Sequence, residues 1–97
     1  MYEHTEEKSA LFQKAISQEL KAELAICDIP NDTIANQLHV HRSTLYKYVG
    51  GKSTPTVDFM YSFCKLVGIK PEWFMRRVLE RLEILKYNES AATGRGR

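Results

Sequence analysis

The stretch QLHVHRSTLYKYVGGK, residues 37–52, combines a short break, a helical pattern over residues 42–49 and a double-glycine stop. Its apolar residues have the spacing of two short helices that pack across a tight turn: Leu38, Val40, Leu45 and Tyr48. The pattern therefore predicts helices at about 31–38 and 42–49. His39 is expected in the turn, where a left-handed backbone suits His better than a branched residue.

Helical spacing continues on both sides of this stretch. An apolar face runs through residues 7–27 and comprises Phe12, Ile16, Leu20, Leu24 and Cys27. This helix must end before Pro30, and Asn31 or Asp32 is expected to cap the next one.

The second half of the chain carries further helix signals. Thr56 is expected to cap a helix that reaches Val67, and Gly68 is expected to stop it. Pro71 suits the first turn of a fifth helix, which we predict to end at Tyr87. Because strand alternation is absent, the prediction is an all-α bundle of five helices.

The length of 97 residues suits one domain, predicted here as residues 1–88, followed by a flexible basic tail at 89–97. No apolar run approaches the ~18 residues of a membrane span, and the acidic start lacks a signal-peptide pattern. We therefore expect no membrane association and a cytoplasmic location. Cys27 and Cys64 each lie in an apolar helical pattern, which favours reduced core thiols over a disulfide or a metal pair.

Charge is unevenly distributed along the chain. Residues 33–57 contain Arg42, Lys47 and Lys52 and no acid, whereas residues 1–32 contain three lysines and seven acids. An acid-free basic stretch in an otherwise mixed chain is a footprint for an anionic partner, although three charges can also form a solvated surface.

The polar side chains of this basic stretch fit an anionic partner better than they fit a metal ion. His39 and His41 lack the further ligands of a zinc site, because no Cys, Asp or Glu lies between Asp32 and Asp58. A helix that reads the major groove needs small residues near its start, long donors to reach the base edges, and no acids to repel phosphate. Residues 42–49 meet these needs, and Arg42 can bind guanine through two hydrogen bonds. Nothing in the chain resembles a catalytic site, so an enzyme is not expected.

Residues 34–69 resemble the lambda-repressor-like (XRE-type) helix-turn-helix domain. The segments that carry the likeness are IA (34–35), LHV (38–40), RSTL (42–45), GK (51–52), PTVD (55–58) and LVGI (66–69). His39 departs from the Gly that the family usually has in the turn, and residues 7–27 lack the family's Arg-rich first helix. The segment STLYKYV (43–49) also resembles the TetR family, which predicts the same recognition helix but needs a large ligand domain.

The resemblance implies a DNA-binding transcriptional regulator of the phage or bacterial repressor type, associated with the nucleoid and acting without a cofactor. Helix 42–49 would lie in the major groove of double-stranded DNA. The expected base-reading residues are Arg42, Ser43, Tyr46 and Lys47. The expected contacts to the DNA backbone are Asn31, His41, Thr44, Lys52, Ser53 and Thr54.

Helix 71–87 has a wider apolar stripe than one small core needs. Either it packs on the first and fourth helices, or it forms the surface of a homodimer that reads a palindromic operator. The candidate dimer residues are Trp73, Phe74, Val78, Leu82 and Leu85, and helix 7–27 is the competing dimer element. Two alternatives stay open: an antitoxin-like module that holds a protein partner through helix 71–87 or the tail, and a non-specific nucleoid protein.

Overall fold

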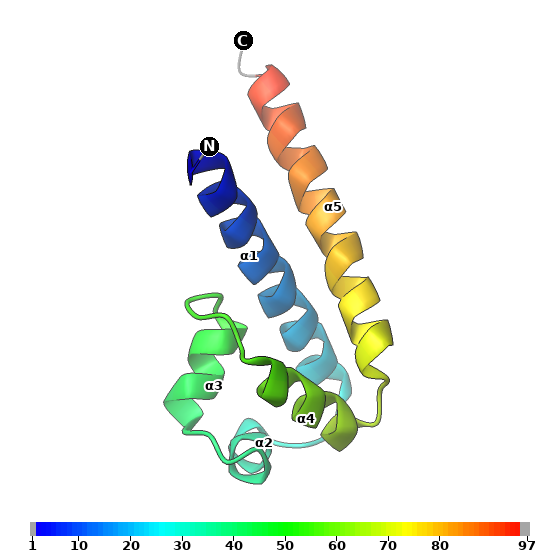
Figure 1. The fold of residues 1–97 in the computed structure, drawn as a ribbon. Coiled ribbons are helices and arrows are strands. Elements are labelled where there is room, and N and C mark those ends of the chain that lie inside the picture. Colours follow the sequence, from blue (N-terminus) through cyan, green and yellow to red (C-terminus); the bar gives the residue numbers. More distant parts are fainter. Residues whose placement is uncertain (1, 96–97) are drawn as a thin grey trace.

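Five α-helices and short links account for the backbone from residue 2 to residue 95 (Figure 1). This computed structural model describes residues 2–95, with side chains described from residue 10 to residue 89. The helices are α1 (Tyr2–Ile26), α2 (Asn31–Gln37), α3 (Arg42–Val49), α4 (Val57–Val67) and α5 (Pro71–Arg95). No strand occurs in this part of the chain, which confirms the predicted all-α class.

The two long helices, α1 and α5, lie side by side and run in opposite directions (Figure 1). The shorter helices α2, α3 and α4 gather at one end of this pair, and the two chain termini lie at the other end. In this view α3 lies on the left of the molecule, and the link from α4 to α5 lies on the right. The arrangement leaves the outer face of α3 open on one side.

The core lies where the short helices meet the long pair. Its buried apolar side chains are Ala15, Ile16, Leu20, Ile34, Ala35, Leu45, Phe59, Phe63, Cys64, Phe74 and Val78. Aromatic rings connect α3 to α5 through it, with ring centroids 4.8 Å apart for Tyr48 and Phe59 and 6.1 Å apart for Phe63 and Phe74. Edge-on ring pairs of this kind stabilise a core beyond their area burial. The packing fixes α3 relative to α4 and α5.

Local signals place both ends of α4 and the start of α5 as predicted. The Thr56 hydroxyl oxygen accepts a hydrogen bond of 3.0 Å from the Phe59 N–H, which confirms the cap of α4. Gly68 ends α4 in the left-handed conformation with φ of 81°, and its N–H donates to the Cys64 carbonyl at 2.9 Å. Pro71 is the first residue of α5, as expected from its fixed φ and missing N–H.

The turn between α2 and α3 depends on His39. Its φ is 58°, and it has the only positive φ of a non-glycine residue in the described part of the chain. The left-handed residue turns the chain so that the Val40 N–H donates to the Ala35 carbonyl at 3.0 Å. The predicted turn at His39 is therefore confirmed.

Three predicted helix ends were wrong. α2 has Pro30 in the cap position, so neither Asn31 nor Asp32 caps it, and no side-chain cap bond forms. α1 begins at Tyr2 rather than at residue 7, and α5 continues from residue 87 to Arg95. Both extensions lack proline, and residues 88–93 include Glu89, Ala91 and Ala92, which favour helix. The backbone of most of the segment expected as a flexible tail is thus helical, and residues 96–97 lie outside the described residues.

The hydropathy of the helices bears on membrane association. Within the described part of the chain, none of the helices has the length and apolar character that crossing a bilayer requires.

Candidate nucleic-acid interface

One face of α3 is buried and the other is open. Leu45 is fully buried against the core, and Tyr48 and Val49 are half-buried. The four residues predicted to read bases are all exposed: Arg42, Ser43, Tyr46 and Lys47. Tyr46 and Lys47 follow Arg42 and Ser43, respectively, by four residues, about one helical turn, so the two pairs lie on one side of the helix. The structure therefore brings the predicted reading residues together on a surface that a partner can reach.

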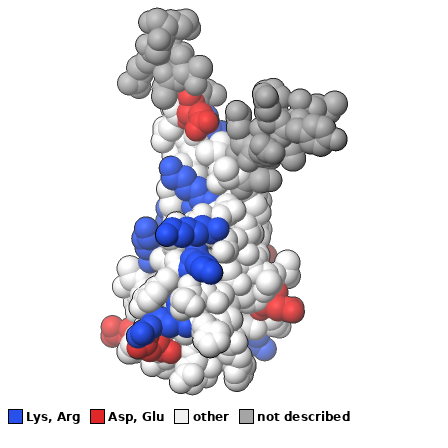
Figure 2. Space-filling model, turned by 90° about the vertical axis from the view of Figure 1, so that its left-hand side faces the viewer, with Lys and Arg blue, Asp and Glu red and all other residues white. Residues whose placement is uncertain are grey.

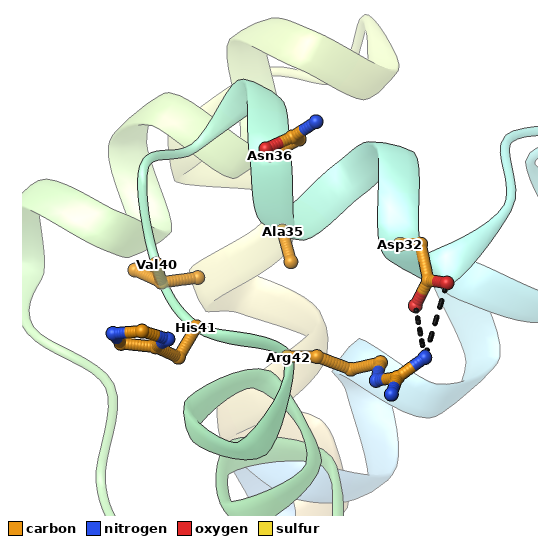
Figure 3. Close-up of a pocket in the computed structure, with 6 residues that line it drawn as sticks. All are labelled: Asp32, Ala35, Asn36, Val40, His41 and Arg42. Carbon is orange, nitrogen blue, oxygen red and sulfur yellow. Dashed lines mark hydrogen bonds and ion pairs between the residues drawn. The ribbon is translucent and has the colours of Figure 1, made fainter.

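Arg42 forms an ion pair that the sequence did not predict. Its Nη1 lies 3.2 Å from Oδ2 and 3.3 Å from Oδ1 of Asp32, in the first turn of α2 (Figure 3). Both side chains are more than half exposed, and exposed pairs of this kind contribute about 0–1 kcal/mol. Because this ion pair is weak, Arg42 can leave Asp32 and bind another acceptor at a small cost in free energy.

A polar hollow of about 390 Å³ opens beside this ion pair. The side chains that line it come from α2, the turn and the start of α3: Asp32, Ala35, Asn36, Val40, His41 and Arg42 (Figure 3). His41 and Arg42 extend in opposite directions from the start of α3 (Figure 3). Asn36 was not among the predicted site residues. No periodic signal marks it, because its place at the hollow follows from the crossing of α2 and α3.

The predicted backbone contacts fall at both ends of this surface. Asn31 is exposed at the start of α2, and His41 at the start of α3, whereas Thr44 is half-buried. Lys52, Ser53 and Thr54 lie in the loop after α3, where Lys52 and Thr54 are exposed and Ser53 is half-buried.

The loop after α3 is fastened to α1 by side chains that sequence reasoning missed. Gln13 donates a hydrogen bond of 2.7 Å to the Gly51 carbonyl and accepts one of 3.0 Å from the Thr54 hydroxyl. Ser17, which is buried, donates a short hydrogen bond to the Val49 carbonyl. These three bonds hold α3 and its loop against α1. Only their polarity within an apolar helical face could have marked them in the sequence.

Basic side chains dominate the side of the molecule that carries α3. Figure 2 shows this side, with Lys and Arg gathered along its middle and acidic side chains at its edges. Residues 33–57 contribute no acid to it. Asp32 of α2 is ion-paired with Arg42, which partly neutralises its charge.

A second charged cluster lies between α1 and α5, and the sequence analysis did not predict it. Glu19 is 1% exposed, and its Oε1 accepts a hydrogen bond of 2.6 Å from Nε of Arg81. Nε of Arg77 lies 3.9 Å from the same oxygen. Glu23, one turn along α1, is also buried. The i, i+4 spacing of the two acids on α1 and of the two arginines on α5 was the available signal.

Burial changes the proton affinity of two groups near this cluster. Desolvation, together with a hydrogen bond to Glu19 and repulsion from it, raises the pKa of Glu23 to about 6. Desolvation, with a smaller contribution from Glu23, raises the pKa of the Cys64 thiol to about 11. Cys27 and Cys64 are both free thiols. Cys64 is thus an unreactive core residue at neutral pH.

The candidate dimer residues on α5 do not form one surface. Phe74 and Val78 are fully buried in the core of their own chain, so their assignment to a dimer surface was wrong. They are buried because α5 packs on α1 and α4, which was the competing interpretation. Leu82 and Leu85 are half-buried against this core, and Trp73 is 40% exposed with the guanidinium of Arg77 over its ring.

Comparison of the chain with models of known protein families, with curated proteins and with solved structures finds no significant match. Among the described residues, no three His, Cys, Asp or Glu side chains come together in a way that could hold a metal ion. Within the same set of residues, His39 and His41 in particular have no third ligand. The function of the chain must therefore be inferred from the geometry of α2, the turn and α3.

Proposed function

We propose that this chain is a sequence-specific DNA-binding transcriptional regulator, of the phage or bacterial repressor type and of the lambda-repressor-like helix-turn-helix class. One observation carries the proposal: Arg42, Ser43, Tyr46 and Lys47 are exposed together on one face of α3. No acid lies in residues 33–57 to repel a phosphate backbone. The left-handed turn at His39 supports it, because it lets two short helices cross with the second one projecting.

In this proposal α3 lies in the major groove. Arg42 leaves Asp32 and binds guanine through two hydrogen bonds, and Lys47 reaches a base one turn further along α3. Ser43 and Tyr46 contact bases beside them. Donors on both flanks hold phosphates and fix the position of α3 on the duplex: Asn31, His41, Thr44, Lys52, Ser53 and Thr54.

Repression would follow from occupancy of the operator, with no catalysis and no cofactor. A single domain of this size makes few base contacts, so the proposal includes a homodimer that binds two half-sites one helical turn apart. Of the residues first considered for a dimer surface, Trp73 retains the exposure that such a contact needs.

Selection of bound duplexes from a random DNA pool tests this function. A palindrome is expected from a dimer and a single half-site from a monomer. Arg42→Ala should then cost about 1–3 kcal/mol on the selected duplex and relax discrimination at one base pair. Lys52→Ala should weaken binding to all sequences alike. It should also make the negative slope of log affinity against log salt concentration less steep by about 1.

Lys70→Ala is a matched control, because Lys70 is exposed in the link between α4 and α5, away from α3 (Figure 1). Absence of DNA binding at physiological salt would refute the function. Binding without enrichment of any sequence would indicate the non-specific nucleoid protein instead. An Arg42→Ala variant with unchanged affinity for the selected duplex would refute the assignment of the reading helix.

A second candidate function is a protein-interaction module, such as an antitoxin, that also binds DNA. An apolar groove of about 320 Å³ between α4 and α5 favours it, because Val57 and Tyr61 remain exposed there. Co-purification with the full chain and with a Val57→Asp variant tests this candidate. A partner that the full chain retains and the variant loses would support it, and unchanged partners would exclude the groove as the contact.

A further inference from the structure

The charges of α1 are separated onto different faces. Glu19 and Glu23 are buried and turn toward α5, where Glu19 pairs with Arg81. Lys14 and Lys21 are exposed, and their spacing of two helical turns places them on one stripe. A helix whose described charges sum to zero therefore presents a cationic stripe on its outer face.

This stripe borders the end of α3. A hollow of about 390 Å³ is lined by Ala10, Lys14, Ser17, Gln18, Lys21, Gly50 and Gly51. Gly50 and Gly51 bring the loop backbone to the edge of this hollow. Lys52 follows directly and continues the positive charge onto the loop.

The stripe and α3 are held in a fixed relation. Gln13 and Ser17, on the same helix as the two lysines, donate hydrogen bonds to the Gly51 and Val49 carbonyls. The Val49 carbonyl is the last one of α3, so the bond from Ser17 satisfies one of the acceptors at the C-terminal end of this helix. A ligand positioned by α3 therefore meets α1 in a defined place.

Both lysines are available for an anionic partner. Neither ammonium group forms an ion pair with a carboxylate among residues 10–89. The view of the α3 side shows basic side chains running up the middle of the surface (Figure 2). An extended polyanion matches such a run better than a single small anion does, because its charges are spaced along a line.

We propose that Lys14 and Lys21 of α1 bind the phosphate backbone of the duplex whose major groove α3 occupies, with the Gly50–Gly51 loop between them and α3. This inference rests on the proposed function. It extends the proposed DNA-contact surface to α1, which supplied none of the DNA contacts expected from the sequence. The expected ligand is a run of DNA phosphates that flanks the base pairs read by α3. The contact adds affinity and sets the length of the bound site without adding base specificity.

Salt dependence of DNA binding tests the proposal. The wild type, Lys14→Ala, Lys21→Ala and the double variant are titrated with the selected duplex and with a random duplex at several salt concentrations. A plot of log affinity against log salt concentration has a negative slope. Each substitution should make this slope less steep by about 0.9, equally on both duplexes. Shortening the selected duplex on the flank that α1 covers should lower wild-type affinity and abolish the difference between wild type and double variant. Lys70→Ala, which removes the same charge elsewhere, should leave the slope unchanged.

The outcomes separate this inference from the function it rests on. If the wild type binds DNA and Arg42→Ala weakens it, while the double variant keeps the wild-type slope, the α1 contact is wrong and the function stands. An equal loss in Lys70→Ala and in the lysine variants would show a general charge effect and would also overturn the α1 contact. If the wild type binds no duplex, the proposed function itself fails. Because both lysines are exposed, circular dichroism should show unchanged folding for every variant.

Discussion

Replacement of Glu23 by Gln should stabilise the protein at neutral pH. The Glu23 carboxyl is buried on α1 beside Glu19, and its pKa rises from an ordinary 4.5 to about 6. Burial is the largest cause, followed by a hydrogen bond to Glu19 and repulsion from its charge, whereas Arg77 and Arg81 act in the opposite direction. Gln is neutral and can donate the hydrogen bond that protonated Glu23 donates to Glu19.

The sign follows from proton binding. Between pH 4.5 and 6 the folded protein holds a proton at Glu23 that the unfolded chain releases, so the free energy of unfolding falls as the pH rises through this window. A difference of about 1.5 pKa units corresponds to about 2 kcal/mol. The Gln variant lacks this titration. It should match the wild type at pH 4.5 and exceed its free energy of unfolding by about 1–2 kcal/mol above pH 6.

Urea unfolding followed by circular dichroism measures this difference at a series of pH values. Carboxylates that do not interact with Glu23 contribute equally in both proteins and cancel in the difference. Asp28→Asn, at an exposed residue, controls for the loss of one acidic side chain. A Gln variant that is less stable than the wild type at neutral pH, or a difference that does not grow between pH 4.5 and 6, would refute the reasoning.

Arg81→Met should lower the free energy of unfolding by about 3–5 kcal/mol, because it leaves the 1% exposed Glu19 carboxylate without its 2.6 Å partner. Glu19→Gln should cost less in the same urea titration, since the 27% exposed Arg81 side chain can be hydrated. His39→Gly should raise stability by about 0.5–1 kcal/mol in thermal melts, and His39→Val should lower it by about 1–2 kcal/mol, because φ is 58°. Asp32→Asn should tighten binding to random duplex DNA by up to about fivefold, since it releases Arg42 and removes an acid from the surface. The same substitution should also reduce the ratio of the affinity for the selected duplex to the affinity for random DNA.

Short-range rules explain what could be predicted from the sequence. The cap at Thr56, the stop at Gly68, the start at Pro71 and the turn at His39 each depend on the conformation of one residue and its near neighbours. Helical spacing likewise separated the buried Leu45 from the exposed side of α3. These features needed no knowledge of how the helices pack.

Long-range packing explains what could not be predicted. Glu19 and Arg81 are 62 residues apart, so no local rule joins them. In the sequence, Phe74 and Val78 were equally compatible with a core and with a dimer surface. The packing of α5 on α1 buries both side chains in the core. Asn31 or Asp32 was expected to cap α2, but Pro30 occupies the cap position, and the Asp32 carboxylate pairs with Arg42 instead.

The separation of charge on α1 also explains why the charge pattern of the sequence did not indicate that α1 adds lysines to the basic surface beside α3. Residues 1–32 are acidic in sum, so the charge pattern indicated the acid-free residues 33–57 as the footprint of an anionic partner. In the structure Glu19 and Glu23 are withdrawn toward α5, while Lys14 and Lys21 face outward beside the loop after α3. The field that a partner meets depends on the charges at the surface it approaches, because screening over about 8–10 Å suppresses the more distant ones. An anionic partner on the α3 side therefore meets the lysines of α1, although the segment that supplies them is acidic.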